Sequence, residues 1–128
     1  MNCRSCDIEL TAENSYLSNH INWIHLCKDC SKKFARERHR QLRQLVIATY
    51  GGKCTCPCGC NQSQWEYLGI DHKDGGGNQH RRQIGAPRKF LQWIVKNSYP
   101  KTLRLLCHNC HYAITFYGYC PREKPIME

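Results

Sequence analysis

Cysteine is the feature of this sequence that most limits its possible folds, because eleven of the 128 residues are cysteines. Four of them form two Cys-x-x-Cys pairs, Cys3 with Cys6 and Cys27 with Cys30, and twenty residues separate the pairs. A two-residue gap lets both thiolates of a pair reach one tetrahedral ion, and two pairs complete its ligands. The spacing therefore predicts a structural zinc site, with no open position for a substrate, in a zinc-ribbon-like unit at residues 1–30.

A second structural zinc site is predicted from a third Cys-x-x-Cys pair and from the cluster CTCPCGC at residues 54–60. The expected ligands are Cys54, Cys58, Cys107 and Cys110. The choice within the cluster is ambiguous, because no two of its cysteines have the two-residue gap. Gly59 eases a turn after the preferred second thiolate, and Cys56 with Cys60 is the alternative. Cys120 is left over, and we expect a packed core thiol there.

The charge of the chain indicates a polyanionic partner. Nineteen lysines and arginines against ten acidic residues give a formal net charge of +9, which favours DNA, RNA or an acidic membrane surface. No stretch is long and apolar enough to span a bilayer, and the start of the chain lacks the apolar core of a signal peptide. We therefore expect a cytoplasmic protein with no membrane partner, in which reduced thiols bind zinc and do not form disulfides.

Hydrophobic periodicity and turn residues predict an α+β protein. The expected elements are a helix at 31–50, a strand at 65–71, a glycine-rich loop at 73–86, a helix at 87–97, a strand at 102–106 and a final helix starting at 107. Ser31 is the expected cap of the first helix, and Gly51 its expected end. The predicted regions are the zinc unit at 1–30, a connecting helix at 31–50 and a second domain at 51–128.

Two groups of basic residues are predicted to contact nucleic-acid phosphates. One lies in the first half of the connecting helix, and the other lies in the glycine-rich loop. Their members are Lys32, Lys33, Arg36 and Arg40 in the helix, and His80, Arg81 and Arg82 in the loop. Cations clustered in this way favour docking on a DNA backbone, so double-stranded or branched DNA is the expected partner.

Two short segments of the second domain carry a resemblance to a known family. The segments are LGIDH at residues 68–72 and LRLLCHNCH at 103–111. Together they resemble the signature of H-N-H endonucleases, above all those of phages and prophages, and they are similar to phage endonuclease VII. The resemblance extends over residues 50–121. It implies a ββα-metal fold, a hairpin crossed by one helix around a catalytic cation, and the host cytoplasm as the site of action.

The resemblance also implies roles for individual residues. His72 matches the general base, while Asp71 and His111 match ligands of a catalytic divalent cation, with Mg²⁺ or Mn²⁺ expected. The middle asparagine of the signature would fall at Thr102, so the chain departs from the family there, and a single hydroxyl replaces the amide that normally braces the loop of the base.

The same residues suit phosphodiester hydrolysis on chemical grounds. A neutral imidazole can take a proton from water near neutral pH, and a cation with open positions can grip a phosphate oxygen. Sequence alone therefore predicts a DNA endonuclease that nicks or cuts both strands, and cutting both strands would require a homodimer or two successive nicks. The alternatives are a zinc-finger protein that binds DNA without cutting it, and a nuclease that acts on RNA.

Overall fold

A computed structural model describes residues 1–123 of the chain, apart from the side chain of His20. The chain forms two compact units, Met1–Gln41 (the first unit) and Leu42–Glu128 (the second unit). The boundary falls inside the longest helix, and not at residue 30 or 50 where composition changes. The fold is α+β, with one two-stranded sheet in the second unit. No helix in the described part of the chain combines the length and the apolar character needed to cross a membrane.

The first unit contains a tight turn, the short helix α1 (Leu17–Ile21) and most of α2 (Lys28–Thr49). Backbone hydrogen bonds from Cys3 to Ile8 (2.7 Å) and from Asp7 to Cys3 (2.8 Å) close the turn. Its core is small, because the fully buried cluster consists of Cys3, Leu26 and Cys27. So little apolar burial predicts that the unit needs a metal to stay folded.

The predicted connecting helix begins three residues earlier than expected, at Lys28. Ser31 is therefore not its cap. The Cys27 thiol takes that place, because its Sγ accepts the backbone N–H of Cys30 at 3.4 Å. The hydroxyl of Ser31 instead accepts a hydrogen bond from Asn19 Nδ2 at 2.9 Å. The predicted end of the helix is confirmed: Gly51 has a φ of 106°, a left-handed conformation that glycine adopts without strain.

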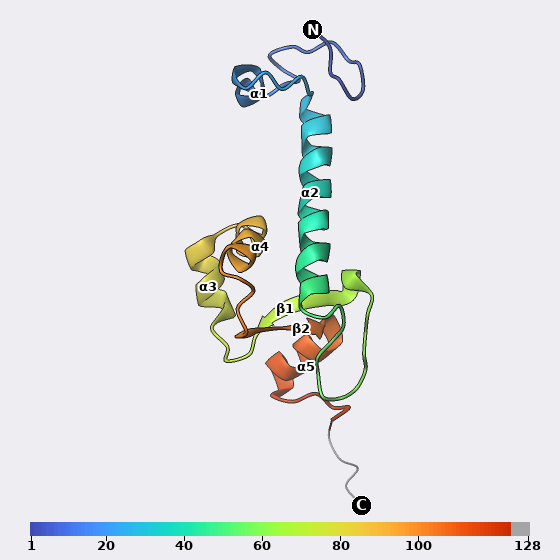
Figure 1. Cartoon of the computed structure of the whole chain (residues 1–128), viewed down its shortest axis with the longest axis vertical. Helices are drawn as coiled ribbons and strands as arrows, with labels where there is room; N and C mark the ends of the chain where they lie inside the picture. The colour runs from blue at the N-terminus through green and yellow to red at the C-terminus, as the bar shows by residue number, and fades with distance from the viewer. Residues whose placement is uncertain (124–128) are drawn as a thin grey trace, which may run out of the picture. The chain divides into compact units, whose positions relative to one another are not determined.

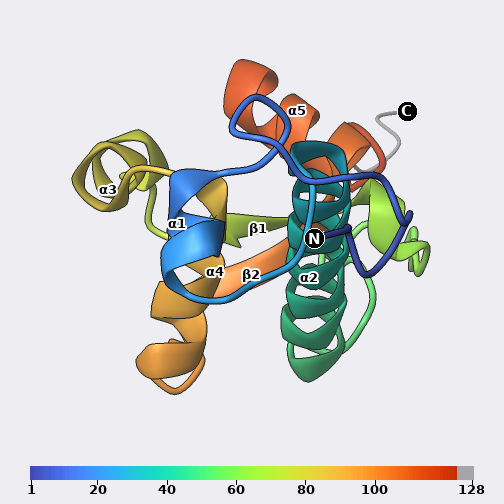
Figure 2. The ribbon, with the colours of Figure 1, turned by 90° about the horizontal axis from the view of Figure 1, so that it is seen from above.

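The sheet of the second unit pairs β1 (Leu68–His72) with β2 (Leu103–Cys107) in antiparallel register. Both predicted strands are confirmed, although the first three residues of the expected strand form a short 3-10 helix, Trp65–Tyr67. The register places Asp71 opposite Arg104 and His72 opposite Leu103. In both views β1 and β2 lie side by side with helix α5 against them (Figure 1, Figure 2).

Helix α5 (His108–Tyr117) starts directly after β2 and ends at Gly118. Its N-cap is Cys107, whose side chain accepts the backbone N–H of Cys110. The residue at the other end, Gly118, has a φ of 81°. The final helix is thus confirmed, and because it follows β2 directly, the third Cys-x-x-Cys pair lies at the junction of sheet and helix.

Two apolar clusters hold the second unit together. One surrounds the sheet and the cysteines, and includes Ile47, Leu68, Leu105 and Leu106. The other joins α2 to α4 (Pro87–Lys96) and β2 through buried Val46, Leu91, Ile94 and Leu103. The predicted helix at 87–97 is therefore confirmed, with proline in its first turn and its apolar side facing the core.

The glycine-rich segment differs from expectation. Residues 73–86 were predicted to form a loop, but they contain helix α3 (Gly77–Ile84). Gly75 and Gly76, with φ of 76° and 80°, make the turn that precedes it. The polar composition gives little helical signal, and the helix is held by tertiary contacts in which His80 packs on aromatic rings of α4.

Candidate functional site

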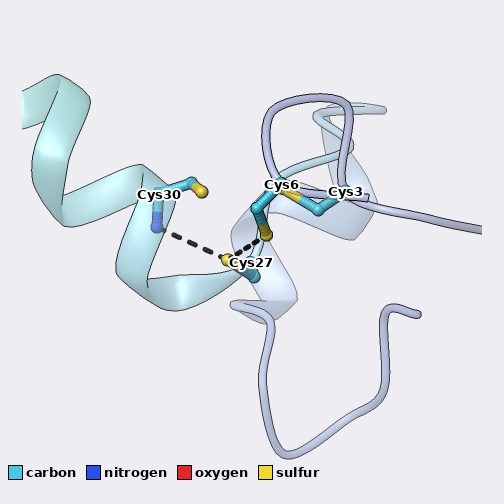
Figure 3. Close-up of side chains that lie close together, drawn as sticks. All are labelled: Cys3, Cys6, Cys27 and Cys30. Carbon is cyan, nitrogen blue, oxygen red and sulfur yellow. Dashed lines mark hydrogen bonds between the residues drawn. The ribbon is translucent and has the colours of Figure 1, made fainter. Parts of the chain in front are cut away.

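The four cysteines of the first unit meet as the spacing predicted. The Sγ atoms of Cys3, Cys6, Cys27 and Cys30 all lie within 4.8 Å of one another (Figure 3). Cys6 Sγ and Cys27 Sγ are 3.7 Å apart, and the turn at residues 3–8 and the start of α2 contribute one pair each. Four thiols in one small volume could hold a zinc ion with a complete tetrahedral shell.

The surroundings of this group favour the thiolate form of Cys3, whereas burial and the neighbouring thiols raise the pKa of Cys6 and of Cys30. Burial opposes ionisation of Cys3, but backbone hydrogen bonds from Cys27, Cys6 and Ser5 outweigh burial and lower the pKa of Cys3 to about 6. A thiolate is the form of cysteine that binds metal. The backbone turn thus prepares the Cys3 thiol, in particular, to bind a cation.

The second cysteine group differs from both predicted sets. The four thiols that lie within 4.8 Å of one another are Cys54, Cys60, Cys107 and Cys110. Cys60 Sγ is 4.0 Å from Cys107 Sγ and 3.8 Å from Cys110 Sγ, and Cys54 Sγ accepts the backbone N–H of Cys107 at 3.2 Å. The first choice, Cys54 with Cys58, and the alternative, Cys56 with Cys60, each contained one cysteine of this group.

The backbone of the cysteine loop explains the difference. Cys54 donates its backbone N–H to Gln62 O at 2.8 Å, so the two ends of the loop are joined, and Cys54 and Cys60 lie near each other. Gly59 does turn the chain, with a φ of 75°. The backbone hydrogen bond from Gly59 to Cys56 O forms a tight turn in the middle of the loop. Cys58 lies in this turn and belongs to a different group from Cys54 and Cys60.

A third group contains the remaining cysteines, Cys56, Cys58 and Cys120, together with Cys110, which also belongs to the second group. Cys58 Sγ is 3.6 Å from Cys110 Sγ, and Cys120 Sγ is 4.0 Å from it. Cys120 is buried, as expected of a core thiol, but it lies among candidate ligands. In residues 1–123, groups of three or more candidate ligand atoms within 4.8 Å consist of cysteines alone.

Two of the predicted catalytic residues, Asp71 and His72, lie at the end of β1, and the third, His111, lies in α5. The carboxylate of Asp71 has two neighbours: Arg104 Nε donates to its Oδ2 at 2.9 Å, and His111 Nε2 lies 3.3 Å from its Oδ1. The side chain of Asp71 is 17% exposed and that of His111 is 41% exposed. The structure therefore brings the two predicted cation ligands together at a place that solvent can reach.

His72 has a different environment from its neighbour in the chain. Its Nε2 lies 2.9 Å from Nδ1 of His80, and its ring stacks on Phe90 with centroids 5.6 Å apart. Burial, together with the electrostatic effects of His80 and Arg81, lowers the pKa of His72, and the electrostatic effect of Asp71 partly opposes the shift. The imidazole is therefore neutral at neutral pH and able to accept a proton.

The loop around His72 is tightly fitted. A side chain at Gly77 would place its Cβ 3.1 Å from His72 Nδ1, so only glycine fits there without movement. Thr102, at the position that the resemblance gives to asparagine, accepts the backbone N–H of Lys73 at 2.9 Å through its carbonyl oxygen. A backbone contact thus braces the residue that follows His72.

The predicted phosphate contacts fall into two classes. The exposed ones are Lys32, Lys33, Arg36, Arg40, Arg81 and Arg82. His80 is half-buried, with its ring 4.3 Å from that of Trp93, and is a partner of His72. Sequence reasoning also missed Arg104, whose alternation with Leu103 and Leu105 in β2 was the available signal.

The charged face of α2 is continuous within the first unit. Lys32, Lys33, Arg36 and Arg40 are all exposed, and at about 100° per residue they lie within roughly a quarter to a third of the helix circumference. Such a stripe can follow a phosphate backbone.

Comparison with known proteins assigns no family to these sites. No protein-family model, no curated protein and no solved structure matches this chain.

Proposed function

We propose that the second unit is a metal-dependent endonuclease that hydrolyses DNA phosphodiester bonds, with His72 as the proton acceptor. The observation that carries the proposal is that His111 Nε2 lies 3.3 Å from Oδ1 of Asp71, the residue that precedes His72 in the chain. Support also comes from the antiparallel pairing of β1 with β2 and from α5, which follows β2 directly, because the H-N-H resemblance implies a pair of strands crossed by one helix. In this chain α3 and α4 lie between the two strands.

The donor atoms of this pair suit a divalent cation. A carboxylate oxygen and an imidazole nitrogen, partly open to water, can hold Mg²⁺ or Mn²⁺ and leave coordination positions free. When bound, such a cation supplies positive charge to the phosphate oxygens as the bond to the leaving group breaks. Asp71 and His111 would hold it, and Arg104 would keep the carboxylate oriented through its hydrogen bond.

His72 supplies the acid–base chemistry. Its lowered pKa keeps the imidazole neutral at neutral pH, so it can take the proton of the attacking water. His80 holds the ring by a 2.9 Å hydrogen bond, and Phe90 supports one face of it. A proton acceptor that is fixed in this way does not have to be ordered again in each catalytic cycle.

One observation favours the alternative of a zinc-finger protein that binds DNA without cutting it. Asp71 already has a cationic partner, because Arg104 Nε donates to its Oδ2 at 2.9 Å. A structural ion pair would give Asp71 a role without any catalytic metal. The exposed cations of α2 and the cysteine groups would serve a binding protein equally well.

The decisive experiment is cleavage of plasmid DNA, a four-way DNA junction and RNA by the purified chain with Mg²⁺, Mn²⁺ or EDTA. We expect DNA cleavage that requires the cation. His72→Ala should lower the rate by about 100-fold or more, which is the usual contribution of a general base. Asp71→Ala and His111→Ala should weaken the response to cation, with partial rescue at high concentration. His25→Ala, a histidine of the first unit, is the matched control and should cleave normally.

The outcomes separate the candidate functions. A His72→Ala protein that is folded, zinc-loaded and as fast as the wild type would overturn the assignment of the proton acceptor. A wild-type protein that binds DNA without cleaving any substrate would support the alternative. Preferential cleavage of RNA would keep the chemistry and change the substrate.

A further inference from the structure

The two cysteine groups of the second unit are not separate, because they share one residue. Cys110 belongs both to the group with Cys54, Cys60 and Cys107 and to the group with Cys56, Cys58 and Cys120. Its Sγ lies 3.8 Å from Cys60 Sγ on one side, and 3.6 Å from Cys58 Sγ and 4.0 Å from Cys120 Sγ on the other. The two groups together thus contain seven thiols, namely that of Cys110 and six around it.

These separations match the edges of a tetrahedron of thiolates around zinc. With a zinc–sulfur bond of about 2.3 Å, neighbouring sulfur atoms in such a tetrahedron lie about 3.8 Å apart. Four of the Sγ–Sγ distances in the two groups run from 3.6 to 4.0 Å, and all the others within a group are at most 4.8 Å. Each group is therefore compact enough for a four-ligand site, and the two sites meet at one sulfur.

We propose that the second unit holds a binuclear zinc–thiolate centre in which the Cys110 sulfur bridges two ions. One ion takes its terminal ligands from Cys54, Cys60 and Cys107, and the other takes them from Cys56, Cys58 and Cys120. The chain then binds three zinc ions in total, one in the first unit and two in the second. This assignment is independent of the nuclease proposal.

The number of cysteines agrees with a bridge. Three four-coordinate ions need twelve thiolate bonds, and one thiolate that bonds to two ions lets eleven cysteines provide them. The chain has eleven cysteines, and each belongs to at least one of the three groups. A single ion in the second unit would instead leave three thiols, two of them buried, against a filled site without a function.

The fold can stabilise the negative charge of the centre. Two Zn²⁺ ions replace seven thiol protons, which gives the centre a net charge of about −3. The centre lies at the N-terminus of α5, where Cys110 donates its backbone N–H to Cys107 Sγ at 3.4 Å and Cys107 donates its own to Cys54 Sγ at 3.2 Å. Donors and a helix dipole at this end stabilise negative charge.

Native mass spectrometry of the full chain, purified under reducing conditions, counts the ions directly. We expect three zinc ions per chain for the wild type, and two for Cys56→Ser and for Cys120→Ser. Cys6→Ser is the matched control, because it should lose the ion of the first unit and keep the pair in the second. Two zinc ions in the folded wild-type chain would overturn the proposal.

Cadmium-113 NMR of the substituted wild-type chain tests the bridge itself and needs no variant to fold. We expect three signals, two of which show scalar coupling to each other through the shared sulfur. The same coupled pair should persist in Cys6→Ser, with the third signal gone. Three signals without coupling would show that the ions are bound without a bridge, which would overturn the role of Cys110.

Discussion

The two units differ in the size of the apolar core that lies beside their cysteines. In the first unit, four thiols surround one candidate metal position, and the fully buried core beside them adds only Leu26. In the second unit, seven thiols sit beside a substantial apolar core that includes Ile47, Leu68, Leu105 and Leu106. A second apolar cluster joins α2, α4 and β2.

This difference indicates what a metal ion at each cysteine group would do for the fold. Where apolar burial is small, metal binding has to supply the folding free energy, and removal of the metal should unfold the unit. Where an apolar core exists, metal binding fixes a loop and the start of a helix, and the sheet has other support. The following predictions test this contrast, in order of decreasing expected effect.

Cys27→Ser should unfold the first unit completely. The apparent binding free energy of a structural zinc ion is about 10–16 kcal/mol near neutral pH, far more than one buried leucine can replace. Hydrogen exchange should show loss of backbone protection over residues 1–27, with protection retained in β1, β2 and α5. Asp29→Ala, an exposed change within the same Cys-x-x-Cys pair, should leave both units protected. Persistent protection without zinc would show that the apolar core suffices.

Leu106→Ala should weaken the second unit without removing its metal. The side chain is fully buried in β2, so its truncation should lower the free energy of unfolding by about 2–5 kcal/mol. Urea titration followed by near-ultraviolet circular dichroism measures the loss, and mass spectrometry checks the zinc content. Val95→Ala, at a side chain that is 39% exposed, is the control with a small expected effect. Loss of zinc together with stability would mean that core and metal act as one.

Replacement of Lys32, Lys33, Arg36 and Arg40 by alanine should weaken DNA binding at all sequences. If each side chain neutralises a phosphate, the slope of log affinity against log salt should flatten by about 0.9 per lost contact. Replacing the exposed pair Arg81 and Arg82 should flatten it by a further amount, which would show that both units contact the backbone. Alanine at Lys96 and Lys101 controls for net charge, and an unchanged slope in the fourfold variant would make α2 a solvated face.

The pKa of His72 should lie below its ordinary value of 6.5 and should rise in His80→Gln. Burial would still act in this variant, but the charge of His80 would be gone. Since the neutral ring is the proton acceptor, activity should persist to a pH below 6.5 in the wild type, and its acid limb should move to higher pH in the variant. NMR titration of the ring without added divalent cation measures this, and Arg82→Gln is the control. A downward shift in His80→Gln would contradict the electrostatic explanation.

Local sequence patterns identified most of the elements, because the physics that forms them is local. Pro87 and the spacing of Leu91 and Ile94 predicted α4, and Gly51 and Gly118 end helices where left-handed backbone is required. The predicted start of α2 was wrong by three residues, because the thiol of Cys27 caps the helix. The usual preferences for helix-capping residues do not include cysteine. Helix α3 was missed, because its composition is polar and its support comes from rings in α4.

The candidate catalytic site was partly visible in sequence. Asp71 and His72 are adjacent, and the strand period of two sends neighbouring side chains to opposite faces. The structure shows the consequence: Asp71 contacts Arg104 and His111, and His72 contacts His80. These partners lie eight to forty residues away, so no local pattern names them.

Sequence patterns were enough to predict cysteine pairs suited to zinc, a basic helix, and two strands with Asp71 and His72 at the end of the first. The division of the cluster CTCPCGC became visible only in the folded chain. Its cysteines alternate at equal spacing, so sequence distance cannot tell one from the next. The hydrogen bond from Cys54 to Gln62 closes the loop and brings Cys60 into the group of Cys54, while Cys58 lies in the other group. Cys110 in α5 belongs to both groups, so the cysteines of the loop are divided around this one residue.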